Sequence, residues 1–276
     1  MSQRLTRRNL LFSFGGGLAV SSAGVAQSSE LLRSAKHGAG NGSVSPWLPG
    51  QATALCIGVA DYEGRAYLRT PGADAKAVSD RLSRLGYKVH TLINPTFKET
   101  LRGLASFRLQ SRGAKLTLIY VAGHGIQIAD TLHFLTRDAF NAGDIRPEKL
   151  VPETSFLQAT GDQPRQRVLI LDCCRTAPGV LRDRCIGNTA IAPSGQAGIC
   201  VTYAAQRGGA AYDGIGPHSP FAHAFLHSLE TPEMEFERAT RRIRLDVIKR
   251  TQGLQVPWMR SSLLLPISIA GHLPQA

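Results

Sequence analysis

Two segments of the sequence carry side chains suited to nucleophilic chemistry, and each directly follows a short apolar run. Residues 122–125 read Ala-Gly-His-Gly, and residues 172–175 read Asp-Cys-Cys-Arg. A thiol and an imidazole can act together as nucleophile and base in an attack on an acyl carbon. Catalytic groups collect beyond the carboxyl ends of parallel strands. If the two runs are neighbouring strands, we expect the Cys174 sulfur and the His124 imidazole to come within bonding reach of each other.

The elements that must position these residues alternate along the chain. Runs typical of buried strands occupy residues 54–59, 87–93, 116–121, 167–171 and 199–203, and helical spacing of apolar residues occupies 73–85, 98–112, 219–230 and 233–250. Strands that alternate with helices predict a mostly parallel sheet covered on both sides. The expected fold is therefore a three-layer α/β/α domain, in which residues 122–125 and 172–175 lie at the ends of strands.

The spacing of the two segments leads to a resemblance. His124 lies 174 − 124 = 50 residues before Cys174, which matches the caspase spacing of about 50 residues. The chain resembles the caspase-like cysteine peptidases (peptidase C14 type), especially the bacterial relatives of the metacaspases. The matching pieces span nearly all of residues 54–263: Ile57-Gly58-Val59 with Asp61-Tyr62, Gly72 to Ala75, Tyr120 to Gly125, Leu171 to Arg175, Tyr203 to Pro220, and Val256 to Leu263.

The resemblance implies roles for three residues. Cys174 would be the nucleophile and His124 the general base, and the backbone N–H groups of Gly125 and Cys174 would form the oxyanion hole. Successive residues of a strand point to opposite faces, so the adjacent thiol of Cys173 is expected to pack beneath the site. The alternatives are a loop histidine that caps a strand and a pair of buried structural cysteines.

The same resemblance points to the substrate. Caspases carry Gln two positions before the nucleophile, in a pocket for an acidic side chain, whereas this chain carries Asp172. A carboxylate there repels an acid and favours a guanidinium or ammonium group. Asp74 aligns with a second acid of the metacaspases, which predicts cleavage after Arg or Lys. Alternatively, Asp74 only interacts with a helix dipole and Asp172 pairs only with Arg175. Ala122 stands where many relatives carry Ser, which leaves the fine specificity open.

The amino terminus reads as an export signal. Residues 1–26 combine a basic start, an apolar middle and small residues at the end, and they resemble a twin-arginine signal. A Sec signal and a basic amphipathic tail are the alternatives. The expected localisation is exported, periplasmic or extracellular. Beyond the signal we expect a linker at 27–51 and a catalytic domain at 52–272, which comprises a large-subunit-like part (52–178), a loop (179–198) and a small-subunit-like part (199–272).

The charge and the motifs of the sequence indicate which kinds of partner the protein binds. The formal net charge is +12, and 25 of the 32 cationic residues are Arg, but they are scattered and accompany no nucleic-acid-binding motif. We therefore expect a protein or peptide substrate, no nucleic acid, and contact with the membrane only transiently during export. The absence of a C-x2-C pair argues against structural zinc, and no cofactor is expected. Calcium activation and the oligomeric state stay open, since the scattered acids form no calcium loop.

The loop at 179–198 and the pair Cys185 and Cys200 raise two further questions. A basic-specific enzyme could cut itself after Arg182 or Arg184, or this loop could stay whole. Cys185 and Cys200 could form a disulfide or stay as separate thiols.

A catalytically weak caspase homologue that acts as a binding or scaffold module in the cell envelope is the competing function. A serine hydrolase is disfavoured because the sequence lacks a G-x-S-x-G elbow.

Overall fold

The computed structural model describes residues 50–62, 67–128, 131–142, 144–161, 166–175 and 197–271. The expected signal at 1–26 and nearly all of the expected linker lie outside these ranges, as do Arg182, Arg184 and Cys185. The structure therefore bears on the expected catalytic domain.

A six-stranded sheet forms the centre of the described chain, in the order β11-β10-β9-β3-β1-β2. Its strands are β1 (Ala52–Gly58), β2 (Lys88–Ile93), β3 (Leu116–Gly123), β9 (Gln166–Cys173), β10 (Ile199–Tyr203) and β11 (Trp258–Ser261). Neighbouring strands run parallel except for β11, which pairs antiparallel with β10. Every residue of β1, β3, β9 and β10 is buried, as expected for strands covered on both faces.

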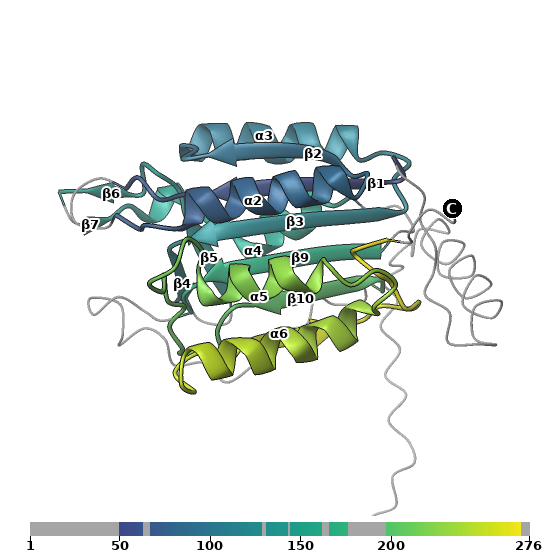
Figure 1. Ribbon diagram of the computed structural model, residues 1–276. Coiled ribbons are helices and arrows are strands. Elements are labelled where there is room, and N and C mark those ends of the chain that lie inside the picture. Colours follow the sequence, from purple (N-terminus) through teal and green to yellow (C-terminus); the bar gives the residue numbers. More distant parts are fainter. Residues whose placement is uncertain are drawn as a thin grey trace, which may run out of the picture.

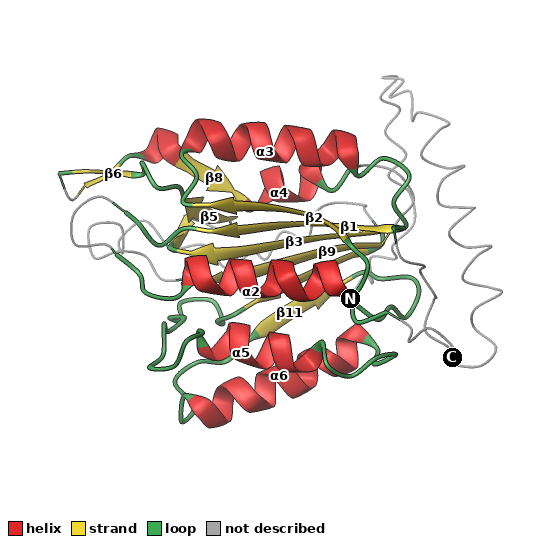
Figure 2. Cartoon of the chain, turned by 45° about the horizontal axis from the view of Figure 1, so that its top comes forward, coloured by secondary structure: helices red, strands yellow, loops and turns green. Residues whose placement is uncertain are grey.

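Helices cover both faces of this sheet (Figures 1 and 2). One face carries α2 (Pro71–Arg84), α5 (Pro220–Ser228) and α6 (Phe236–Arg250), and the other carries α3 (Phe97–Gln110) and α4 (Glu153–Ala159). Side chains alternate along β3: Leu118 and Tyr120 belong to the core on the α2 side, whereas Ile119 and Val121 belong to the core on the α3 side. The prediction of a three-layer, mostly parallel α/β/α fold is confirmed.

Local sequence explains where the helices begin and end. Thr96 and Glu99 form a capping box at the start of α3. Ser219 caps α5 by accepting the Ala222 N–H at 2.9 Å. Gly86 follows α2 with a φ of +90°, a conformation that glycine adopts without steric cost. The four predicted helices are confirmed, with ends that differ by up to three residues from those expected.

Short elements between β3 and β9 had no counterpart in the sequence-based expectations. They comprise a three-stranded sheet of β4 (Gly125–Ile128), β5 (Thr131–Leu135) and β8 (Leu150–Pro152), a two-stranded ribbon of β6 (Phe140–Asn141) and β7 (Asp144–Ile145), the 3-10 turn Pro147–Lys149, and α4. Figure 1 shows β4, β5 and the ribbon beyond the carboxyl end of β3. This extension frames the edge of the sheet where His124 lies.

Candidate active site

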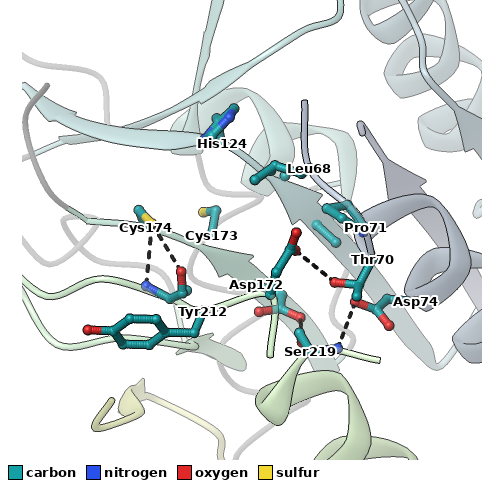
Figure 3. Close-up of a pocket in the computed structure, with 14 residues that line it drawn as sticks. Leu68, Thr70, Pro71, Asp74, His124, Asp172, Cys173, Cys174, Tyr212 and Ser219 are labelled. Carbon is teal, nitrogen blue, oxygen red and sulfur yellow. Dashed lines mark hydrogen bonds between the residues drawn. The ribbon is translucent and has the colours of Figure 1, made fainter. Parts of the chain in front are cut away.

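His124 and Cys174 occupy equivalent positions at the ends of neighbouring strands. β3 and β9 pair in parallel with Gly123 opposite Cys173. His124 and Cys174 are therefore the first residues after the ends of these two strands. Both line one pocket, which is drawn in Figure 3. The two residues therefore line the same pocket, and a hydrogen bond between the imidazole and the thiol stays a prediction.

Glycines on either side of His124 permit this close approach. A Cβ at Gly125 would lie 2.7 Å from the Cys173 sulfur and 2.7 Å from the Cys174 carbonyl oxygen, so the His124 turn packs directly against the two cysteines. A Cβ at Gly123 would lie 2.6 Å from the Tyr62 hydroxyl. The glycines thus serve close packing, because contacts this short exclude any larger residue.

Tyr62 fixes the backbone of His124. Its buried hydroxyl accepts the His124 N–H at 2.8 Å and donates to the Leu135 carbonyl at 3.2 Å. The Tyr62 and His124 rings lie with their centroids 4.7 Å apart, and the Phe140 ring meets the imidazole edge-on at 6.1 Å. The imidazole therefore packs in a cluster with two aromatic rings, which also contact each other at 5.7 Å. The matching piece Asp61-Tyr62 contains this support, although no local pattern singled out Tyr62.

The two cysteines differ in environment. Cys173 is 1% exposed and belongs to the core, as predicted, whereas Cys174 is half-buried. The Cys174 sulfur accepts the Ala211 N–H at 3.3 Å and lies 3.4 Å from the Ala211 carbonyl oxygen. Burial raises the pKa of the Cys174 thiol, and the Ala211 N–H opposes that rise only in part. At neutral pH the thiol is therefore protonated and needs a base to become a nucleophile.

Two backbone N–H groups beside the cysteine are left without partners in the strand ladders of the described chain. Leu135 donates to the His124 carbonyl at 3.0 Å, so Gly125 and Phe134 form a non-hydrogen-bonded pair and the Gly125 N–H points away from β5. The Cys174 N–H donates no hydrogen bond to any residue that the structure describes. These are the two donors that the resemblance assigns to the oxyanion hole.

Asp172 lies buried at the same strand end. Its Oδ2 accepts hydrogen bonds from the Tyr120 hydroxyl at 2.9 Å and the Ser219 hydroxyl at 2.7 Å. Its Oδ1 accepts none from the described residues, and the residue lines the pocket. The alternative in which Asp172 pairs only with Arg175 is wrong. The Arg175 guanidinium instead lies over the Tyr203 ring at 4.1 Å and donates to Gln127 at 3.3 Å.

Asp74 contributes a second carboxylate to the pocket from the first turn of α2. It is 1% exposed, its Oδ1 lies 2.7 Å from His218 Nδ1, and its Oδ2 accepts the Ser219 N–H at 3.3 Å. Burial raises the pKa of Asp74, while His218 and Ser219 lower it. Asp74 therefore lines the pocket as well as standing at a helix N-terminus.

A third acid, Asp213, was missed by the sequence analysis. It lines the same pocket, where its Oδ1 accepts the Thr70 hydroxyl at 2.9 Å and its Oδ2 accepts the Arg69 N–H at 2.6 Å. Figure 3 labels Thr70 among the residues that line this pocket. The residue falls inside the matching piece Tyr203 to Pro220, but nothing local in that glycine-rich stretch marks it as pocket-lining.

The pocket has a marked charge asymmetry. Among the described residues, its lining includes three carboxyl side chains and neither Lys nor Arg. Burial raises the pKa of Asp172 to about 7, and the Asp74 charge adds to that rise. Ionising two buried carboxyl groups near each other costs free energy, and a cation bound between them would lower that cost.

The described ranges contain neither a metal-ligand cluster nor a membrane-spanning helix. No three or more of their His, Cys, Asp or Glu side chains are arranged to hold a metal ion. No helix there combines the length and apolar character needed to cross a bilayer. Cys200 is a free, buried cysteine of β10. Its possible disulfide partner, Cys185, lies outside the described residues.

Comparisons with known proteins agree with this fold. The family model of the caspase domain matches residues 51–267. The crystal structure of caspase-1 from Spodoptera frugiperda is similar, with a TM-score of 0.63 and 14% sequence identity, over 86% of this chain and 96% of that one. At this identity the structural match supports the fold alone. No curated protein matches the sequence.

Proposed function

Because this chain belongs to the caspase family, we propose that it is a cysteine endopeptidase that cleaves peptide bonds after Arg or Lys. The observation that carries the proposal is a single pocket that combines His124 and Cys174, from adjacent strand ends, with three carboxylates. The dyad supplies the chemistry, and the carboxylates supply the charge that a basic substrate side chain requires.

In the proposed reaction, His124 takes the proton of the Cys174 thiol and the sulfur attacks the carbonyl carbon of the substrate. The N–H groups of Gly125 and Cys174 hold the oxygen of the tetrahedral intermediate, and one such donor is typically worth about 3 kcal/mol in the transition state. His124 then gives the proton to the leaving amine. Water hydrolyses the remaining thioester, with His124 again as the base.

The raised pKa of the Cys174 thiol agrees with general-base catalysis at this site. Without substrate, the Cys174 thiol is uncharged and is hydrogen-bonded to the backbone of Ala211. A substrate backbone that engages the 211 segment would free the sulfur for attack. In this proposal His124 removes the thiol proton only after the bound substrate has displaced the Ala211 contact.

Localisation and domain organisation form part of the proposal. We expect residues 1–26 to direct export and to be removed, which leaves a linker at 27–51 and a catalytic domain at 52–272. Expression of the full chain with Arg7 and Arg8 both replaced by Lys tests the twin-arginine signal. Loss of export of the variant, with export of the parent, would support it, whereas equal export would favour a Sec signal.

Matched peptides that end in Arg, Lys or Asp before a fluorogenic amide test the activity, with and without calcium. We expect cleavage after Arg and Lys, none after Asp, and loss of activity in Cys174→Ala. His124→Ala should lower kcat by about 10²–10⁴-fold, the usual contribution of a general base. Cys200→Ala removes a buried thiol outside the pocket and should keep activity.

Two outcomes would overturn this assignment. A preference for Asp would contradict the basic specificity. Binding of benzamidine without cleavage of any peptide would favour the alternative, a catalytically weak homologue that serves as a binding module.

A further inference from the structure

Two adjacent residues, His218 and Ser219, connect the two most buried acids of the pocket. The His218 ring contacts Asp74 Oδ1 at 2.7 Å, and the Ser219 N–H reaches Asp74 Oδ2 at 3.3 Å. The Ser219 hydroxyl donates to Asp172 Oδ2 at 2.7 Å. One serine therefore contacts both carboxylates, through its backbone and through its side chain.

We propose that His218 and Ser219 are positioning residues, which hold Asp74 and Asp172 at the spacing that selects a guanidinium over an ammonium group. This inference rests on the proposed function and extends it to two residues and to a preference for Arg over Lys. Neither residue reacts with the substrate in this proposal. Their part is to fix the direction and separation of the carboxylates.

The geometry explains why such a bridge is needed. Asp74 and Asp172 are 1% and 6% exposed, and two buried carboxylates repel each other. The Ser219 hydroxyl is itself fixed, because the same oxygen accepts the Ala222 N–H at 2.9 Å as the cap of α5. Asp172 is thereby oriented from the capped start of α5, and its Oδ1 stays available to a ligand.

The fixed pair suits one cation better than the other. A guanidinium is planar and presents five N–H donors in a fork, so it can face two carboxylates at once. An ammonium group is a compact point charge with three rotatable donors, and it can follow carboxylates that move. Loss of the bridge should therefore reduce cleavage after Arg more than cleavage after Lys.

The test measures kcat and KM for matched Arg and Lys peptides with the full chain and with Ser219→Ala. We expect KM for the Arg peptide to rise about tenfold, the loss typical of a hydrogen bond to a charged group, with kcat changed less than threefold. The ratio of kcat/KM for Arg over Lys should fall by a similar factor. Ser219→Thr retains the hydroxyl and should restore both values.

A second variant addresses the other end of the bridge. His218→Ala should raise KM for the Arg peptide, and His218→Asn, whose amide nitrogen can stand where Nδ1 does, should restore it. Thr96→Ala removes a comparable helix cap at α3, outside the pocket, and controls for loss of stability. Melting curves of all variants verify that they are folded.

The outcomes separate this inference from the function on which it depends. If the parent protein cleaves neither Arg nor Lys peptides, the proposed function fails. If the parent cleaves them, and Ser219→Ala and His218→Ala keep its KM and its Arg-to-Lys ratio, the function stands and the positioning role is overturned. Equal losses in Ser219→Ala and Thr96→Ala would also overturn it, since helix stability alone would then explain the effect.

Discussion

We propose that the charge of Asp172 decides which side chain the pocket binds. Its environment opposes ionisation: burial is the largest cause that raises its pKa, the charge of Asp74 adds to it, and hydrogen bonds from Ser219 and Tyr120 compensate only in part. The result is a pKa of about 7 in place of the ordinary 3.8. A carboxyl group of this kind is half-protonated near neutral pH, and it binds a cation well only after it has lost its proton.

The raised pKa of Asp172 makes a prediction for benzamidine, a cation that requires no catalysis to bind. The carboxylate form increases as pH rises through 7, so inhibition by benzamidine should tighten about tenfold between pH 6 and pH 8. The inhibition constant Ki, measured against the Arg peptide, gives this dependence. In Asp172→Asn binding should be weak and nearly independent of pH. A parent Ki that is flat, or that weakens as pH rises, would contradict this assignment.

At the scale of elements, the contact between β1 and α2 places Asp74. A Cβ at Gly58, the last residue of β1, would lie 2.3 Å from the Pro71 carbonyl oxygen and 2.8 Å from the Ala75 Cβ. The first turn of α2 can therefore pack on the strand only because residue 58 has no side chain. Asp74 belongs to that turn, so its position in the pocket depends on the same contact.

Gly58→Ala should therefore disturb both stability and substrate binding. Overpacking of this kind costs about 1–3 kcal/mol, and a displaced α2 would raise KM for the Arg peptide. Gly72→Ala is the matched control, because its Cβ would meet only Ile93 at 3.7 Å and alanine favours a helix. Thermal unfolding and peptide kinetics of both variants test this. Equal stability of the two variants would contradict the packing argument.

The regular elements were predictable because their sequence patterns are local. Continuous apolar runs identified five strands of the sheet, and helical spacing identified four helices. β11 was missed because its four residues lie at the edge of the sheet and show no run or alternation. β4 was missed because only His124 separates it from β3, so no turn signal marks the boundary.

The site divides in the same way. His124, Cys174, Asp74 and Asp172 stand at strand ends or in a helix turn, where the order of elements brings them together. Asp213 could not be predicted, since its place in the pocket depends on Thr70 and Arg69, more than 140 residues earlier in the chain. His218 and Ser219 escaped notice for the same reason: their partners come from α2 and β9.

On the scale of the whole molecule, residues on both sides of the 176–196 segment build one structure. β9 and β10 pair in parallel across this segment, and the core on the α2 side combines residues such as Tyr120 with Phe221 and Ile243. Hydrogen bonds add to this, for example from the Tyr87 hydroxyl to the Ile269 carbonyl at 2.9 Å. The two parts therefore share their cores and neither has a complete one.

A cut within 176–196 should consequently leave the two parts associated. A recognition sequence for a specific protease, inserted after Gly187 in the Cys174→Ala background, allows that cut without self-processing. We expect the cleaved protein to elute as one species in gel filtration and as two in concentrated guanidinium chloride, because shared apolar burial holds the parts together. Separation in native buffer would show that the parts fold independently. Mass spectrometry of the parent beside Cys174→Ala then tests whether the protein cuts itself after Arg182 or Arg184.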